Sequence, residues 1–160
     1  MVSPKQTHQF LIFQLAIDIQ AMLSTECLGE VLKCEVSQIV PILDMPKPVM
    51  GVSSNRGEVL WLVDLSLLLE LTPLYALGIR QYYDVMVMHY KDRVAGFAVP
   101  KVGQLVNYRV ANMQPPILEN LPGSFGRCLD GLYRRSQGKD TLVLNTAKLF
   151  DLLKKIPSNV

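Results

Sequence analysis

Short apolar runs separated by turn-forming residues are the feature that most constrains this chain. Apolar residues Leu11, Phe13 and Leu15 occupy odd-numbered positions, whereas the polar residues Gln14 and Asp18 occupy even-numbered ones. This alternation predicts a half-buried strand over residues 11–19. Further apolar runs occupy residues 27–32, 49–53, 58–65, 84–90, 94–99, 102–108, 128–133 and 141–144. Strands this short, with turn chemistry between them, predict an all-β barrel or sandwich and not alternating βαβ units.

Turn residues join several of these runs into hairpins. Residues 54–57 read Ser-Asn-Arg-Gly, and Asn and Gly readily adopt the positive φ angles of a tight turn. The run that follows this turn, residues 59–65, does not alternate with polar residues, which predicts a central strand covered on both faces. Further hairpins are expected across residues 91–93 and, with Gly138 in the turn, across residues 134–140.

Helical signals are few. Ser66 is expected to cap a short helix over residues 67–71. Asn145 or Thr146 is expected to cap an amphipathic C-terminal helix that ends before Pro157. The apolar face of that helix comprises Leu149, Phe150, Leu152, Leu153 and Ile156.

Charge and hydropathy exclude several classes of protein. The formal net charge of the 160 residues is only +2, which gives no electrostatic reason to expect a nucleic-acid partner. The most apolar stretch, residues 59–71, contains Asp64 and Glu70 and is shorter than the ~20 residues of a membrane span. With three unpatterned cysteines and no signal-like start, the chain is expected to be cytoplasmic.

Catalytic and metal-binding signals are weak. Cys27 and Cys34 are seven positions apart, wider than the spacing of paired zinc ligands. Cys128 and His89 are the strongest candidates for a thiol enzyme, and a small-ligand barrel is the other alternative, but nothing in the sequence brings these two residues together. The residues therefore disfavour a thiol enzyme, and we expect no metal and no cofactor.

One segment resembles a known family. Residues 51–65, GVSSNRGEVLWLVDL, resemble the signature of CheW-like adaptor domains, roughly G-V-x-N-x-R-G followed by apolar residues and D-L. Residues 94–102, VAGFAVPKV, are similar to the family's V-G-(apolar)-x-V-D-x-V. The resemblance extends over about residues 9–153.

The resemblance implies a mainly β fold, in which two small SH3-like five-stranded β-barrels pack side by side and a C-terminal amphipathic helix follows. The chain would be a single domain, residues 1–160. Its first barrel would span about residues 20–83, its second about residues 84–145 with the N-terminal strand, and the helix residues 146–156. The implied function is a non-enzymatic scaffold. It would couple the tip of a methyl-accepting chemoreceptor to the regulatory domain of a CheA-type histidine kinase, without nucleic acid or membrane insertion.

The resemblance also implies a partner surface on the first barrel. Its six candidate residues match motif positions: Leu28, Glu30, Gly51, Arg56, Gly57 and Asp64. We expect Glu30 and Arg56 to lie within salt-bridge reach, and an apolar patch near Leu28 to bind the kinase. A purely structural role is the alternative for the two glycines and for Asp64, which could cap the next helix.

Three positions depart from the family pattern. Ser54 stands where the family has Asn, Ser66 where an Arg often follows D-L, and Pro100 where the second motif has Asp. These departures predict a divergent member, serving phototaxis or pilus motility instead of the flagellar system. A CheW-like protein that binds the kinase alone, as a decoupled or inhibitory partner, is the alternative within the same class.

Overall fold

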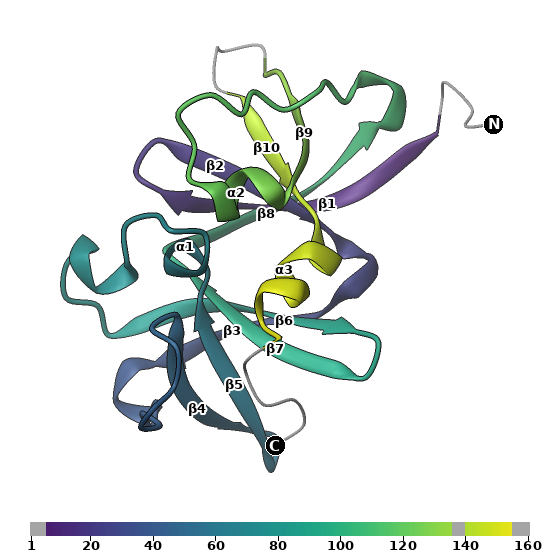
Figure 1. Ribbon diagram of the computed structural model, residues 1–160. Helices are drawn as coiled ribbons and strands as arrows, with labels where there is room; N and C mark the ends of the chain where they lie inside the picture. Colours follow the sequence, from purple (N-terminus) through teal and green to yellow (C-terminus); the bar gives the residue numbers. More distant parts are fainter. Residues whose placement is uncertain (1–5, 136–139, 155–160) are drawn as a thin grey trace.

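The computed structural model describes residues 6–135 and 140–154, and within them ten strands form two five-stranded sheets. The first barrel contains β3 (Leu28–Glu35), β4 (Val49–Asn55), β5 (Glu58–Asp64), β6 (Tyr82–Tyr90) and β7 (Arg93–Val99), in the order β3-β6-β7-β5-β4. The second contains β1 (Thr7–Ala16), β2 (Ile19–Ser24), β8 (Lys101–Arg109), β9 (Leu129–Tyr133) and β10 (Thr141–Leu144), in the order β8-β1-β2-β10-β9. The expected mainly β fold of two packed SH3-like units is confirmed (Figure 1).

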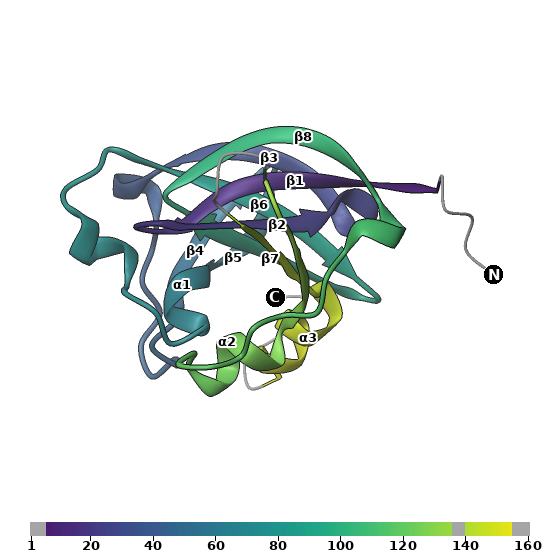
Figure 2. The ribbon, with the colours of Figure 1, turned by 90° about the horizontal axis from the view of Figure 1, so that it is seen from above.

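Three short helices lie together on one side of the two sheets (Figure 2). They are α1 (Leu65–Leu68), α2 (Gly123–Arg127) and α3 (Thr146–Leu152). Single 3₁₀ turns connect other strands: η1 (Thr25–Cys27), η2 (Val36–Gln38), η3 (Leu74–Leu77) and η4 (Val110–Asn112). The short helix α1 begins two residues earlier than expected because Asp64, and not Ser66, caps it.

Strand pairing differs from the expected division at residues 83 and 84. The hairpin β6–β7 belongs to the first barrel, where β6 pairs with β3 and β7 pairs in parallel with β5. The strand β2 belongs to the second barrel, where it pairs with β1 and β10. Pairings between strands far apart in sequence leave no local signal, so apolar patterning alone did not assign these strands to their barrels.

The strand expected over residues 11–19 is in fact a hairpin. β1 ends at Ala16, and β2 begins at Ile19 after a turn in which Asp18 has a φ of 62°. Ile17 kept the period-two parity of the strand although it lies at the exposed turn. Alternation therefore continued across the turn and concealed it.

The largest hydrophobic cluster lies between the barrels. Leu11 and Phe13 of β1 join Trp61 and Val63 of β5 in this cluster, while Leu60 and Leu62 face a separate cluster inside the first barrel. β5 is thus apolar on both faces because each face covers a different core, as its lack of alternation predicted. Since one core serves both barrels, the barrels are held as one body.

The helix α3 reinforces this junction. Asn145 caps it by accepting the Lys148 N–H, and Leu149 and Phe150 are buried in the cluster between the barrels. Arg93, from the first barrel, donates to the carbonyls of Phe150 (3.0 Å) and Leu153 (2.8 Å). The expected helix to residue 156 is observed to Leu152; Ile156 and Gly138 lie outside the described residues.

Candidate partner-binding surface

The β4–β5 hairpin presents an arginine at its tip. The two central turn residues, Arg56 and Gly57, have φ angles of 53° and 80°, as the two-residue turns that match strand twist require. Arg56, and not Asn55 as expected, adopts the left-handed conformation beside Gly57. A glycine suits the second position because a side chain there would be strained, although the space around Gly57 is open.

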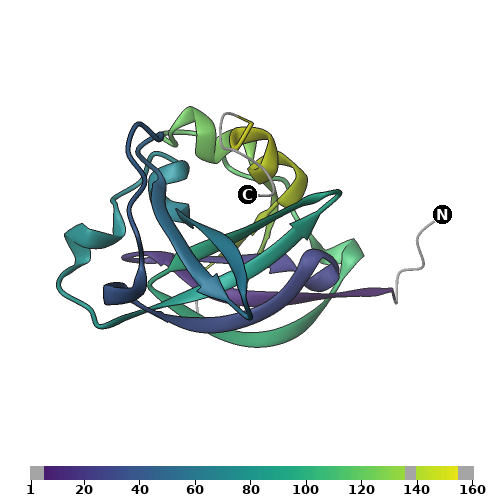
Figure 3. The same ribbon diagram turned by 90° about the horizontal axis from the view of Figure 1, so that it is seen from below.

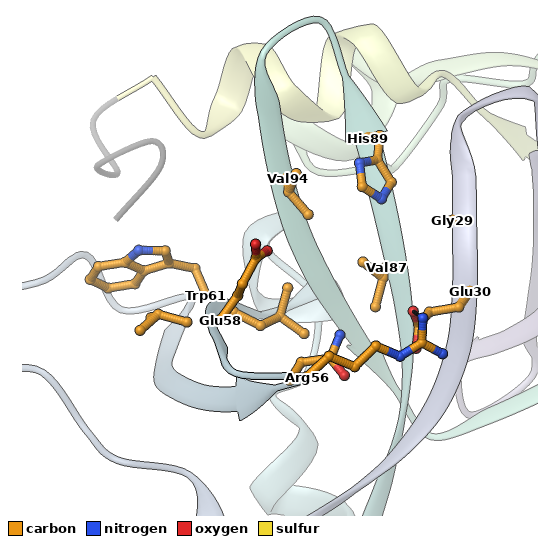
Figure 4. Close-up of a pocket in the computed structure, with 11 residues that line it drawn as sticks. Gly29, Glu30, Arg56, Glu58, Trp61, Val87, His89 and Val94 are labelled. Atoms are coloured by element: carbon orange, nitrogen blue, oxygen red, sulfur yellow. Dashed lines mark ion pairs between the residues drawn. The ribbon is translucent and has the colours of Figure 1, made fainter.

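Arg56 forms the predicted ion pair with Glu30 of β3. Its Nη1 lies 3.4 Å from Glu30 Oε2, with the Arg56 side chain 80% exposed and that of Glu30 29% exposed (Figure 4). An exposed pair of this kind contributes at most about 1 kcal/mol to stability. The Arg56 guanidinium, 80% exposed, remains accessible to a partner that offers a carboxylate.

The ion pair borders an open pocket of about 650 Å³ at one end of the first barrel. Leu60 and Val87, from the barrel interior, line it together with His89 (Figure 4). Gly29 makes room for this imidazole, since a Cβ at Gly29 would lie 2.5 Å from His89 Nε2. Gly29 was not singled out from the sequence, and His89 was considered there only as a catalytic candidate, not as a residue of this pocket.

A bulge in β3 separates Leu28 from Glu30. Leu28 pairs with Met88 and Glu30 with Val87, so the register shifts at Gly29. Because paired residues share a face, Leu28 faces the junction of the barrels and Glu30 faces the pocket. Leu28 is half-buried against the main core, and the exposed apolar side chain nearest to it along this face is Val31, at 42%.

Gly51 and Asp64 are structural residues and not part of the surface. Gly51 is buried with a φ of 138°, and a Cβ there would overlap the carbonyl of Val40. Asp64 is 4% exposed and accepts the N–H groups of Leu67 (3.2 Å) and Leu74 (2.8 Å). Burial raises the pKa of the Asp64 carboxyl, and its side chain is not available to a partner.

The residues considered for catalysis lie in different environments. Cys128 is 1% exposed in the core between the barrels, and burial raises the pKa of its thiol to about 11, which disfavours the reactive thiolate. His89 instead lines the first-barrel pocket. Among residues 6–135 and 140–154, no three His, Cys, Asp or Glu side chains could together hold a metal ion. Across the same residues, no helix combines the length and hydropathy needed to span a membrane.

The chain is thus built from two packed barrels, and a charged hairpin is exposed on the first of them. The sequence matches the family model of the CheW-like domain over residues 9–154, and the chain belongs to this family of scaffold and adaptor domains. Among solved structures it is similar to the scaffolding protein TtCheW from Thermoanaerobacter tengcongensis, with a TM-score of 0.75. The two share 18% sequence identity over 91% of this chain and 94% of that one, a likeness of fold. A search of curated proteins found no match.

Proposed function

We propose that this protein is a cytoplasmic adaptor that couples a methyl-accepting chemoreceptor to a CheA-type histidine kinase. The observation that carries the proposal is the Arg56–Glu30 pair, formed at 3.4 Å beside an open pocket in a chain that belongs to the CheW-like family. Both residues were expected at the partner surface from the family motif. An interaction surface, and no catalytic centre, is what this arrangement supports.

The adaptor would work by holding two partners in fixed relation. One shared core joins the barrels, so a kinase bound to one surface and a receptor bound to another would keep a constant geometry. Each contact would raise the effective concentration for the next, so individually weak interfaces suffice in an array. Rigidity between the barrels is therefore part of the proposed mechanism.

We propose that the kinase's regulatory domain contacts the first barrel near Leu28, Glu30 and Arg56. The bulge at Gly29 gives this region two faces, one apolar and one charged. A partner that covers the edge of β3 would meet the exposed Val31 on one side and the Arg56 guanidinium on the other. Gly57 contributes through the turn conformation that holds Arg56 outward.

Two departures from the family pattern are buried. Ser66 is 1% exposed and donates to the carbonyl of Thr72 at 2.6 Å, and Pro100 is also buried between β7 and β8. Of the three, only Ser54 is exposed, two residues before Arg56. Ser54 is therefore the departure that we propose to affect partner choice, with a phototaxis or pilus-motility array as the proposed setting.

The test is a pair of separate titrations, against the kinase's regulatory domain and against a receptor signalling fragment from the same cell. We expect micromolar binding of both, and loss of kinase binding in Leu28→Glu and Arg56→Ala. Because Leu28 is half-buried, thermal unfolding must show that Leu28→Glu is folded, and Leu118→Glu, at a 55% exposed apolar position, is the matched control. Binding of the kinase alone would favour a decoupled or inhibitory partner, and binding of neither would refute the proposal.

A further inference from the structure

The first barrel is closed along only part of its length. Its sheet ends in β3 on one side and β4 on the other, and the outer edge of β4 is covered by Val40, which exchanges two backbone hydrogen bonds of 2.8 and 2.9 Å with Val52. Beyond this bridge, no backbone hydrogen bond joins β3 and β4 in the described part of the chain. We call the unjoined stretch, between residues 30–35 of β3 and residues 53–55 of β4, the barrel seam. Figure 3 shows the tip of the β4–β5 hairpin beside β3.

The backbone of Ser54 faces the barrel seam without a partner. Backbone groups on one edge of an antiparallel strand recur at every second residue, so the N–H and C=O of Ser54 point to the same edge as those of Val52. Val52 uses both groups to bind Val40, whereas among residues 6–135 and 140–154 nothing binds the Ser54 groups across the seam. A free donor and acceptor at a sheet edge can pair with another strand.

The side chains also leave the barrel seam open. Two contacts cross it: Cys34 Sγ lies 3.7 Å from Ser53 Oγ, and the Arg56–Glu30 ion pair spans 3.4 Å at the hairpin tip. An opening of about 370 Å³ lies between the two strands and reaches Leu60 of the barrel interior, which also lines the pocket beside the ion pair. Because an exposed ion pair contributes little to stability, it can separate when a ligand enters.

The second barrel fills the equivalent place. Its bridge joins Gln114 to Leu132, and the next residue, Tyr133, stacks on Tyr108 of β8 with the ring centroids 4.5 Å apart. The Tyr133 hydroxyl also donates to the Arg109 carbonyl at 3.1 Å. In the first barrel the residue after the bridge is a serine, and it meets a cysteine. The fold therefore permits a seam closed by large side chains, and the open seam is a feature of the first barrel.

The unmatched charge of the barrel seam is negative. Its lining cations are already paired, Lys33 with Asp84 and Arg56 with Glu30. Two further carboxylates, of Glu35 and Glu58, line the openings, and within the described residues neither forms an ion pair. Glu35 accepts only the Tyr82 hydroxyl, at 3.4 Å. A ligand with cationic side chains would supply the missing counter-charges.

We propose that the barrel seam binds an extended basic segment of a partner protein, which adds to β4 as a further strand. Backbone hydrogen bonds to Ser54 would hold the segment, and its alternate side chains would cover Leu60. Lysine or arginine side chains of the segment would pair with Glu35 and Glu58. This inference rests on the proposed adaptor function and deepens it, since it gives the conformation and charge of one segment that the adaptor recognises.

The test uses isotope-labelled full-length protein and an eight-residue synthetic peptide in which valine and lysine alternate. We expect it to shift the backbone amide signals of Ser54, Asn55 and Leu60, and to slow hydrogen exchange of the Ser54 amide. A peptide with glutamate in place of lysine should bind roughly tenfold more weakly. N-methylation of every second peptide residue should abolish binding in one of the two possible phases and not in the other, because only one set of amides faces β4. Neither kinase nor receptor is present, so failure here is distinct from failure of the adaptor proposal.

A proline at the seam separates backbone from side-chain effects. Ser54→Pro removes the N–H that faces the seam and no hydrogen bond between β4 and β5, and proline is tolerated on sheet edges. It should weaken binding of the lysine peptide more than roughly tenfold, whereas Ser54→Ala, which keeps the N–H, should lose much less. Thermal unfolding shows whether Ser54→Pro is folded, and the N-methylated peptides give the same information with the wild-type protein.

Neutralising the carboxylates tests the charge. The double variant Glu35→Gln, Glu58→Gln should weaken lysine-peptide binding roughly tenfold. The matched control, Glu26→Gln, Glu119→Gln, removes the same charge from exposed sites outside the seam and should leave binding unchanged. Equal binding of the lysine and glutamate peptides, equal losses in Ser54→Pro and Ser54→Ala, an equal loss in the charge control, shifts that map elsewhere, insensitivity to N-methylation, or no binding at millimolar peptide would each overturn the proposal.

Discussion

The two barrels pair their strands in the same pattern but assemble it from different parts of the chain. In each sheet an edge strand (β3 or β8) pairs with a hairpin (β6–β7 or β1–β2), which contacts a second hairpin (β5–β4 or β10–β9) through one parallel pairing. The first barrel uses consecutive strands. The second takes its first hairpin from before the first barrel and its other strands from after it.

Details outside the sheets repeat as well. Each edge strand is followed by a 3₁₀ turn and an isolated bridge, Val40↔Val52 in one barrel and Gln114↔Leu132 in the other. Each second hairpin leads into a helix capped by a side chain, Asp64 for α1 and Asn145 for α3. The barrels differ in the connection within that hairpin, which is a two-residue turn at Arg56 in the first barrel and spans residues 134–140 in the second. The strand pairing, the bridge and the helix cap are thus the same in both barrels, while the connection within the second hairpin differs.

Substitution of two glycines at equivalent positions should reveal the largest difference in stability between the barrels. Gly51 and Gly131 each lie where a Cβ would meet a bridging carbonyl, of Val40 or of Gln114, but only Gly51 also has a positive φ. We expect Gly51→Ala to lower the free energy of unfolding by about 3–5 kcal/mol and Gly131→Ala by about 1–3 kcal/mol. Urea denaturation measures both, and an equal or larger loss in Gly131→Ala would break the comparison.

The two helix caps should differ in strength. Asp64 accepts two backbone N–H groups and is buried, whereas Asn145 caps one N–H and is only half-buried. Asp64→Ala should therefore cost about 2–3 kcal/mol and Asn145→Ala about 1 kcal/mol. Thermal unfolding near neutral pH gives both values, and the reverse order would contradict the assignment of Asp64 as the stronger cap.

Only the first cap should be sensitive to pH. Burial raises the pKa of Asp64 above its ordinary value of 3.8, so the folded state binds this proton more tightly than the unfolded chain does. The stability of the wild type relative to Asp64→Asn should therefore increase as pH falls from neutral through the folded-state pKa of Asp64. Denaturation at several pH values, with Asn145→Ala as the reference, tests this, and a relative decrease on acidification would show the opposite shift.

The helices α1 and α3 should also differ in how far their stability depends on a contact from the other barrel. Arg93 binds two carbonyls of the last turn of α3 and lies over the Phe150 ring. We expect Arg93→Met to cost about 1–2 kcal/mol and to speed amide exchange in α3 while leaving α1 unchanged. Lys91→Met, a neighbouring exposed cation, is the control; unchanged exchange in α3 would show that the helix docks without this contact.

The smallest effect on stability is expected at the variable hairpin. Arg56→Asn removes an exposed ion pair but places at the turn a residue that tolerates the left-handed conformation. The free energy of unfolding should change by no more than about 0.5 kcal/mol, while kinase affinity falls more than roughly tenfold. Chemical denaturation and the titration described above separate the two effects, and intact binding would remove Arg56 from the partner surface.

The sequence was most informative where local chemistry decides the structure. The turn at Arg56 and Gly57, the two-sided burial of β5 and the cap at Asn145 all depend on neighbouring residues, and each could be predicted. The turn at Asp18 was missed because Ile17 continued the alternation. The assignment of β6 and β7 was missed because it depends on pairing with a distant strand.

The candidate site was predicted in the same uneven way. The family motif predicted that Glu30 and Arg56 lie within salt-bridge reach, and the ion pair at 3.4 Å confirms this. The family motif could not show that Gly51 and Asp64 are buried, because a motif does not distinguish residues kept for backbone geometry from those that face a partner.

The interleaved order of the strands has a consequence for synthesis. The strands of the first barrel occupy residues 28–99 and can pair as soon as they leave the ribosome, but β1 and β2 lack β8, which begins at residue 101. Between the end of β2 at residue 24 and that point the ribosome adds 77 residues (101 − 24), roughly 4–15 s of elongation. During this interval the face of the first hairpin that carries Phe10, Ile12 and Met22 lacks Tyr133 and Val143, the later residues that bury it, so a nascent chain that stalls in its second half would be a natural substrate for chaperones and proteases.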